Sequence, residues 1–254
     1  MDNLFSLKGK NAVVIGGYRG IGSVFSETYA AAGANVIICA RSVEKCNDLA
    51  AKLNNDYGTK NIGKFIDVKS SHSVDKTIYE IIDEYGKIDI LVNSAGIAGS
   101  QKATFELTDE EIKNVFDVDF FGIFYVSRVV SRAMIEHKNG KIINVASIAA
   151  KIATRYMAGY CASKAAVVQL TRVMALELMK YNIQVNAVCP GYFLTDLNKD
   201  FLSSEKGRKL IKKTIPINRV GNLDELKTTA LYLATCPPFL TGTEIYIDGG
   251  HTII

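Results

Sequence analysis

Short apolar runs recur along the chain, with longer amphipathic stretches between them. The runs are continuously apolar rather than alternating, which is typical of strands buried on both faces of a parallel sheet. The predicted strands are Asn11–Ile15, Asn35–Cys39, Ile62–Ile66, Ile88–Val92, Lys141–Val145, Gln184–Val188 and Glu244–Ile247. The predicted helices are Ile21–Ala32, Val43–Tyr57, Val74–Tyr85, Asp109–His137, Tyr156–Lys180 and Leu223–Ala234. This alternation favours right-handed βαβ units and therefore an α/β fold with a doubly wound, parallel, seven-stranded sheet.

Nothing along the chain marks a second domain. No repeat, low-complexity tract or linker interrupts the pattern, and all four prolines lie beyond residue 189. A length of 254 residues suits one α/β domain with a large core. We therefore predict a single domain over residues 1–254.

Composition and charge exclude several classes of partner. The net charge of +4 (30 basic minus 26 acidic residues) is too small to favour nucleic acid. No apolar run approaches the ~20 residues that span a bilayer, and the first eight residues lack the basic flank and apolar core of a signal peptide. We expect a cytoplasmic protein without a membrane or nucleic-acid partner.

The cysteines and histidines predict neither disulfides nor a metal centre. The five cysteines are odd in number and form no Cys-x-x-Cys pair, which fits reduced thiols. His72, His137 and His251 are scattered, so no metal site is predicted.

A glycine-rich segment joins the first predicted strand to the first predicted helix. It reads Gly16-Gly17-Tyr18-Arg19-Gly20-Ile21-Gly22. Glycines let the backbone turn tightly and approach a pyrophosphate, which then binds the N–H groups at the helix start. Between a strand and a helix, this spacing is fairly specific for a dinucleotide.

The end of the second predicted strand indicates which dinucleotide binds. An NAD-preferring site usually has an acid there for the ribose hydroxyls, but this chain has Ala40, followed by Arg41 and Ser42. A guanidinium can bind a 2′-phosphate through paired hydrogen bonds, and Arg19 can approach the same group. The sequence therefore predicts NADP(H), although two solvated surface arginines are the alternative.

Tyr160 and Lys164 are the candidate reactive pair. Residues four apart share one face of a helix. A fixed ammonium favours the phenolate form of a neighbouring tyrosine, so the pair can exchange protons that an isolated phenol holds too tightly. Ser147 closes a predicted strand, where its hydroxyl can meet a substrate oxygen beside the phenol.

The chain resembles the standard-length short-chain dehydrogenases/reductases, from about Leu7 to Gly250. The motifs that carry the resemblance are Gly16-x3-Gly20-x-Gly22, Asp67-Val68, Asn93-Ser94-Ala95-Gly96, Ser147, Tyr160-x3-Lys164, Pro190-Gly191-x3-Thr195 and Asp248-Gly249-Gly250. The resemblance implies a Rossmann-like fold and oxidoreduction between a ketone and a secondary alcohol.

The resemblance also implies residue roles. Tyr160 would be the acid/base, Lys164 would assist it and bind the nicotinamide ribose, and Ser147 would hydrogen-bond the reacting oxygen. The residues that would line the cofactor are Gly16, Tyr18, Arg19, Gly20, Ile21, Gly22, Arg41, Ser42, Asp67, Val68, Asn93, Ala95, Gly96, Tyr160, Lys164, Pro190, Gly191, Phe193 and Thr195.

Three positions depart from the family pattern. Ile15 replaces a Thr, Ser94 replaces the second Asn of Asn-Asn-Ala-Gly, and Asp119 replaces the Asn of the Asn-Ser-Tyr-Lys tetrad. Asp119 is therefore the fourth catalytic candidate. An Asp there is also similar to peroxisomal dienoyl-CoA reductases, but that branch lacks the active-site Tyr, so Tyr160 favours carbonyl chemistry.

Substrate choice is expected to lie in residues 97–107, 148–159 and 192–218, the last of which is similar to the family's mobile lid. The stretches Leu4–Gly9 and Pro190–Thr195 resemble gluconate 5-dehydrogenases and sugar-ketone reductases. A basic cluster in the lid, from Lys206 to Lys213, can attract an anion or be a solvated helix face. A 3-oxoacyl thioester, a steroid or other bulky ketone, and a non-catalytic cofactor sensor remain alternatives.

The family resemblance further implies a homotetramer, because the helices corresponding to Asp109–His137 and Tyr156–Lys180 pack across a two-fold axis in the family. The sequence alone supports only self-association.

Overall fold

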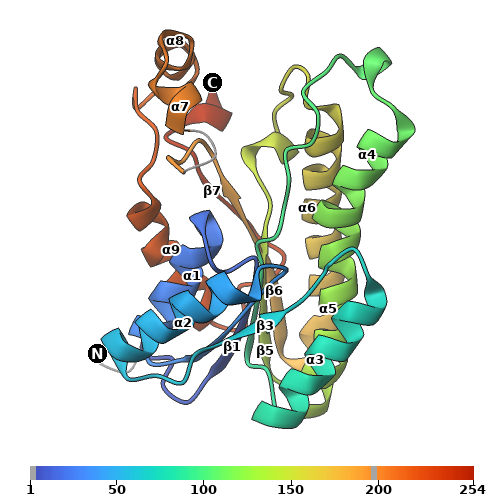
Figure 1. The fold of residues 1–254 in the computed structure, drawn as a ribbon, viewed down its shortest axis with the longest axis vertical. Helices are drawn as coiled ribbons and strands as arrows, with labels where there is room; N and C mark the ends of the chain where they lie inside the picture. Colours follow the sequence, from blue (N-terminus) through green and yellow to red (C-terminus); the bar gives the residue numbers. More distant parts are fainter. Residues whose placement is uncertain (1–3, 196–198) are drawn as a thin grey trace.

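The computed structural model describes residues 4–195 and 199–254, and they form a three-layer α/β fold (Figure 1). Seven parallel strands make one sheet in the order β3-β2-β1-β4-β5-β6-β7. The strands are β1 Asn11–Ile15, β2 Asn35–Ala40, β3 Ile62–Phe65, β4 Ile90–Asn93, β5 Gly140–Val145, β6 Ile183–Pro190 and β7 Glu244–Ile247. The predicted doubly wound sheet, Rossmann-like in its strand order, is confirmed.

Helices cover both faces of the sheet, and they are α1 Gly20–Ala31, α2 Val43–Tyr57, α3 Ser71–Tyr85, α4 Asp109–Phe116, α5 Gly122–His137, α6 Ala158–Leu178, α7 Lys199–Ser203, α8 Glu205–Thr214 and α9 Lys227–Thr235. One buried cluster joins the sheet to α1, α2 and α9, and a second joins it to α3, α5 and α6 (Figure 1). Central strands are therefore buried on both sides, as their continuous apolar runs predict.

Several predicted helices differ from the structure in detail, and α3, for example, begins at Ser71 rather than Val74. The predicted helix Asp109–His137 consists of α4 and α5 joined by a π-helical turn, η2 Asp117–Phe121. The predicted helix Tyr156–Lys180 begins two residues later, at Ala158, because Tyr156 adopts a left-handed conformation with φ of 65°. A short 3₁₀ turn, Leu223–Leu226, precedes α9.

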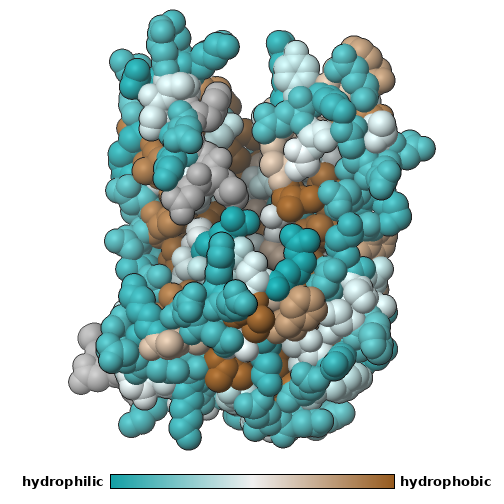
Figure 2. Space-filling view, viewed as in Figure 1, coloured by the Kyte–Doolittle hydropathy of each residue, from teal (hydrophilic) through white to brown (hydrophobic). Residues whose placement is uncertain are grey.

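The strand order places a crevice at the carboxyl edge of the sheet. The chain leaves β1 toward β2 on one side, whereas β4 lies on the other side of β1, so the direction of winding reverses between β1 and β4. Ligands bind at such a switch point in open α/β sheets. Figure 2 shows a notch at this edge, between the side of the molecule that carries α8 and the side that carries α4.

The described helices include none that is long and apolar enough to cross a bilayer. Within residues 4–195 and 199–254, no group of three or more His, Cys, Asp and Glu side chains is arranged to hold a metal ion. The five cysteines are free thiols.

Candidate active site

The glycine loop follows β1 and enters α1 at Gly20. Gly16 has φ of +74°, and a Cβ there would lie 2.9 Å from the backbone nitrogen of Ala95. A Cβ on Gly22 would overlap the carbonyl oxygen of Gly16. Side chains at these positions would collide with backbone atoms, so glycine lets the loop turn tightly into α1 and pack closely against the segment after β4. A tight glycine turn that opens a helix in this way fits a dinucleotide.

The residues predicted to choose between cofactors lie on neighbouring strand ends. β1 and β2 pair in parallel, and Ile15 is in register with Cys39, so the loop after β1 and the residues after β2 meet at one edge. Arg19 and Arg41 are both exposed there, and the guanidinium of Arg19 lies 5.5 Å from the ring centre of Tyr18. β2 ends at Ala40, where an NAD-preferring site usually has a carboxylate.

Lys164 and Tyr160 lie together on the first turns of α6. The Nζ atom of Lys164 is 5.5 Å from the centre of the Tyr160 ring and donates to the carbonyl oxygen of Val145 at 3.3 Å. Val145 ends β5, so this bond joins α6 to the strand that precedes Ser147. The predicted pairing of Tyr160 with Lys164 on one helix face is present in the structure.

Ser147 begins the short turn η3, Ile148–Ala150, which packs against α6. Its Oγ accepts a hydrogen bond from the N–H of Ala149 at 3.1 Å. That bond uses a lone pair of the hydroxyl and not its proton. The O–H of Ser147 can therefore donate to an oxygen atom bound beside Tyr160.

Asp119 forms a buried ion pair with Lys164. Its Oδ2 atom lies 3.3 Å from the Nζ of Lys164, and the two side chains are 0% and 5% exposed. Oδ1 accepts the N–H of Ile97 at 2.8 Å, whereas Oδ2 has no aligned hydrogen-bond donor among the described residues. Residue 119 is the middle residue of the π-helical turn η2, and such turns are frequent at functional sites.

Burial and the ion pair together shift the pKa values of Lys164 and Asp119. Burial alone would lower the pKa of Lys164, but the carboxylate of Asp119, followed by Tyr160, raises it above the ordinary lysine value. Burial raises the pKa of Asp119, although Lys164 and the N–H of Ile97 act in the opposite direction. The side chain of Lys164 therefore holds its proton more tightly than an ordinary lysine, and Asp119 is easier to protonate than an exposed aspartate.

A buried hydrogen-bond network joins β4, β5, α5 and α6, and α6 carries the Tyr160–Lys164 pair. The amide nitrogen of Asn93 donates to Ser127 Oγ on α5 and to Asn144 Oδ1 on β5, both at 2.9 Å. Asn144 in turn donates to Thr171 Oγ1 on α6 at 2.9 Å. The side chain of Asn93, predicted to line the cofactor, therefore points into the core.

The remaining predicted cofactor residues after β3 and β4 lie at the same edge. Asp67 accepts the N–H of Lys69 at 3.1 Å, and Val68, 9% exposed, packs against Gly122. Ala95 lies against Gly16, and Gly96 lies beside the Lys164–Asp119 pair.

The segment after β6 closes the other side of the edge. Pro190 ends β6, and Gly191 donates its N–H to Ile247 on β7 at 2.9 Å. The side chain of Phe193, predicted to line the cofactor, is 4% exposed and packs with Val24 and Leu226 in a small core cluster. The γ-methyl of Thr195 would be 3.9 Å from a Cβ on Gly20.

The predicted lid, residues 192–218, contains α7 and α8, and its residues 196–198 lie outside the described residues. On α8, Lys206, Arg208, Lys209, Lys212 and Lys213 are all exposed, and Lys209 also pairs with Glu205 at 2.7 Å. The predicted basic cluster is therefore accessible from solvent.

Two further residues lie at this edge, Tyr192 and His251. The sequence placed Tyr192 at the start of the predicted substrate region 192–218, but it gave neither side chain a role. Their rings stack, with centroids 5.9 Å apart and an interplanar angle of 19°. Tyr192 follows the Pro-Gly pair after β6, and His251 follows Asp248-Gly249-Gly250 after β7. Their positions just after two strands were the available signal that they lie close together, because β6 and β7 are adjacent and parallel.

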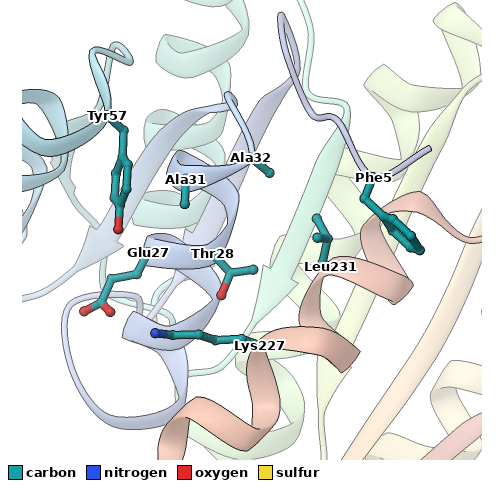
Figure 3. Close-up of a pocket in the computed structure, with 8 residues that line it drawn as sticks. All are labelled: Phe5, Glu27, Thr28, Ala31, Ala32, Tyr57, Lys227 and Leu231. Atoms are coloured by element: carbon teal, nitrogen blue, oxygen red, sulfur yellow. The ribbon is translucent and has the colours of Figure 1, made fainter. Parts of the chain in front are cut away.

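A separate hollow of about 290 Å³ lies at the opposite end of α1 (Figure 3). It is bordered by Glu27, Thr28 and Ala31 of α1, Lys227 of α9 and Phe5 ahead of β1. The glycine loop is at the start of α1, whereas these residues are in its second half. This hollow is therefore not part of the candidate active site.

Comparison with known proteins agrees with this geometry. Residues 10–206 match the family model described as short chain dehydrogenase. The chain belongs to the short-chain dehydrogenase family. This match and the observed strand order confirm the family and the Rossmann-like fold that the sequence predicted. Members of the family bind a nicotinamide cofactor and interconvert ketones and alcohols.

Relatives of this short-chain dehydrogenase span its full length. An NAD-dependent glycerol dehydrogenase from Listeria innocua is 37% identical over 99% of this chain and 97% of its own. A 5-keto-D-gluconate 5-reductase from Escherichia coli is 35% identical over 100% and 99%. The structure of a gluconate 5-dehydrogenase from Burkholderia cenocepacia in complex with NADP and tartrate has 34% identity and a TM-score of 0.94, with 100% and 99% coverage.

Proposed function

We propose that this protein is an NADPH-dependent oxidoreductase that interconverts a ketone and a secondary alcohol, with a sugar acid or sugar ketone as substrate. The observation that carries the proposal is the cluster at the carboxyl edge, where Tyr160 and the ammonium of Lys164 lie beside the turn that begins with Ser147. The glycine loop at the neighbouring strand end is shaped for the pyrophosphate of the cofactor.

A nicotinamide cofactor held at the glycine loop would, when reduced, supply a hydride for the carbonyl carbon. Tyr160 donates its phenolic proton to the carbonyl oxygen, and Ser147 donates a hydrogen bond to the same oxygen as negative charge develops there. The ammonium of Lys164 stabilises the phenolate that remains, and solvent then restores its proton. The products are a secondary alcohol and oxidised cofactor.

Asp119 serves in this proposal as a positioning residue. An unpaired ammonium in a buried site would tend to lose its proton, because burial disfavours charge. The Asp119 carboxylate keeps Lys164 charged, and its bond from the N–H of Ile97 fixes it to the segment that follows β4. The Asp that replaces the usual Asn thus pairs directly with the lysine.

The cofactor assignment rests on the residues after β2. The relatives differ in cofactor, since the Listeria dehydrogenase is named NAD-dependent and the Burkholderia structure holds NADP. Here the acid that would bind the ribose hydroxyls is missing, and Arg41 and Arg19 are exposed at the adjacent strand ends. This arrangement favours the 2′-phosphate of NADPH.

The substrate class rests on two observations. The full-length relatives include a 5-keto-D-gluconate 5-reductase. The exposed lysines and arginine of α8 lie on the lid side of the notch, where they attract an anionic substrate such as an aldonate. The same charges suit the phosphates of a 3-oxoacyl thioester, which is the second candidate.

Steady-state assays in wild type and Arg41→Ala test cofactor and substrate together. We expect wild type to oxidise NADPH with 5-ketogluconate, and with acetoacetyl-CoA far less. Arg41→Ala should lower kcat/KM for NADPH about tenfold, the order expected for a charged hydrogen bond, and change NADH little. Lys76→Ala, at an exposed position on α3, is the control.

A preference for acetoacetyl-CoA would replace the substrate assignment with the thioester. Equal effects of Arg41→Ala on NADPH and NADH would refute the 2′-phosphate assignment. Inactivity of wild type on every carbonyl class would refute the enzyme and leave a cofactor-binding sensor.

We also propose that the protein forms a homotetramer. Large apolar side chains are exposed on the turn η2 and on the outer surfaces of α5 and α6: Phe121, Phe124, Val173 and Leu176. α5 and α6 pack against each other, and a second copy of the chain can cover the apolar side chains exposed on them.

A further inference from the structure

The segment that leaves β6 directs alternate side chains to opposite sides. Phe193 pairs with Gly221 as a parallel bridge, and Tyr192 O and Leu194 N bond to the backbone of Gly221 at 2.9 and 3.1 Å. The segment is therefore extended, and neighbouring side chains point in opposite directions. Because Phe193 packs inward against Val24 and Leu226, Tyr192 points away from that cluster.

Tyr192 lies within electrostatic range of the reactive phenol. Burial, followed by the neighbouring Tyr160 and Cys161, raises the pKa of Tyr192 above the ordinary tyrosine value. The phenol of Tyr192 thus remains an O–H group on the side where Tyr160 lies. No function proposed above uses this hydroxyl.

His251 stacks on Tyr192 and carries an unused polar atom. The ring centroids are 5.9 Å apart at 19°. The buried Nδ1 of His251 has no hydrogen-bond partner among the described residues. A buried polar atom without a partner costs free energy, so it indicates a ligand that supplies one.

The turn that carries His251 is rigidly held. The carboxylate of Asp248 accepts the N–H groups of Gly250 and Thr252, both at 2.9 Å. The N–H of Ile217, at the end of the lid, donates to the carbonyl oxygen of Gly249 at 3.2 Å. The stacked rings are therefore fixed between β6, β7 and the end of the lid, in a position prepared before a substrate binds.

We propose that Tyr192 and His251 form a specificity wall that hydrogen-bonds a hydroxyl group of a polyhydroxylated substrate, at a carbon away from the reacting carbonyl. This inference rests on the proposed function and refines its substrate class. The Oη of Tyr192 donates a hydrogen bond to this substrate hydroxyl, and the Nδ1 of His251 forms a second hydrogen bond with it. An unsubstituted ketone lacks the hydroxyl. The analogue without that hydroxyl leaves both polar atoms unpaired, which is how such sites reject it.

Two ketones of equal length and charge separate hydroxyl recognition from carboxylate recognition. 5-Ketogluconate and 5-oxohexanoate share six carbons, a carboxylate and the ketone position, and only the first carries the hydroxyls. We expect Tyr192→Phe and His251→Phe, which keep the ring stack, each to lower kcat/KM for 5-ketogluconate about ten- to hundred-fold. The loss for 5-oxohexanoate should be far smaller, because that substrate never made these bonds.

The control is Tyr232→Phe on α9, where the ring is 41% exposed. Melting temperatures and NADPH dissociation constants should match wild type in all three variants. Equal losses of kcat/KM on both ketones, or no loss on 5-ketogluconate, would contradict hydroxyl recognition by Tyr192 and His251 and leave the proposed function intact. Wild-type protein that reduces no ketone would instead overturn the proposed function and the wall with it.

Discussion

At the scale of single residues, charge at position 119 distinguishes this site. A neutral amide there would offer Lys164 a dipole, whereas Asp119 offers a full charge 3.3 Å from Nζ in a site closed to water. Oppositely charged neighbours favour each other's charged forms, and burial opposes both. The reactivity of the Tyr160–Lys164 pair is therefore coupled to the protonation of Asp119.

Asp119→Asn tests this coupling through the pH profile of kcat/KM. Without the carboxylate, burial remains to lower the pKa of Lys164, so the ammonium is lost at lower pH and the alkaline limb should move toward neutrality. On the acid side the variant and wild type should behave alike, because Lys164 is charged there whether or not residue 119 carries a carboxylate, so the difference should be confined to the alkaline limb. The variant should also lose about 3 kcal/mol of stability, because it leaves a buried charge unpaired.

Asp117→Asn is the matched control for this variant. Asp117 lies on the same turn, and its pair with Lys113 at 2.6 Å joins an exposed lysine. An unchanged profile in Asp119→Asn, or the same shift in Asp117→Asn, would show that the carboxylate at 119 does not set the charge on Lys164.

At the scale of elements, the apolar runs predicted the strands well, because strands buried on both faces carry their signal in every residue. β1 and β7 have the predicted bounds, and β4 lies one to two residues further along than predicted. The motif spacing likewise predicted which strand ends carry the site. The glycine loop, Ser147 and the Tyr160–Lys164 pair all lie at the carboxyl edge.

Features that depend on contacts between distant segments could not be predicted. The periodicity of Asp109–His137 indicated one helix, because a single π-helical turn changes the phase by only one residue. The inward direction of Asn93 depends on partners from β5 and α5. The stack of Tyr192 on His251 joins residues 59 positions apart (251 − 192), and the motif around Tyr192 gives no sign of its partner.

At the scale of the whole molecule, the layers leave apolar side chains uncovered. Leu176 is 71% exposed on α6, and Phe124 is 37% exposed on α5. Scattered exposed apolar residues are normal, but several large ones on two helices that pack together favour an interface between copies. The proposed tetramer would bury them.

Light scattering coupled to size exclusion tests the assembly. We expect a mass of four times the 27.8 kDa of one chain. Leu176→Glu should produce smaller species, because a charge on the covered surface opposes association. Tyr79→Glu, on α3 with a ring that is 50% exposed, should not. A monomeric wild type, or equal effects of the two variants, would contradict the proposed interface.

The central claim is that Tyr160 supplies the proton while the cofactor is held beside it. Its most direct test is NADPH oxidation by Tyr160→Phe with 5-ketogluconate, with NADPH binding measured in the same sample by fluorescence titration. Removing one hydroxyl should reduce kcat by about 10²- to 10⁴-fold, the contribution typical of a positioned acid, and leave NADPH affinity near wild type. Turnover at the wild-type rate in a variant that still binds NADPH would contradict the account.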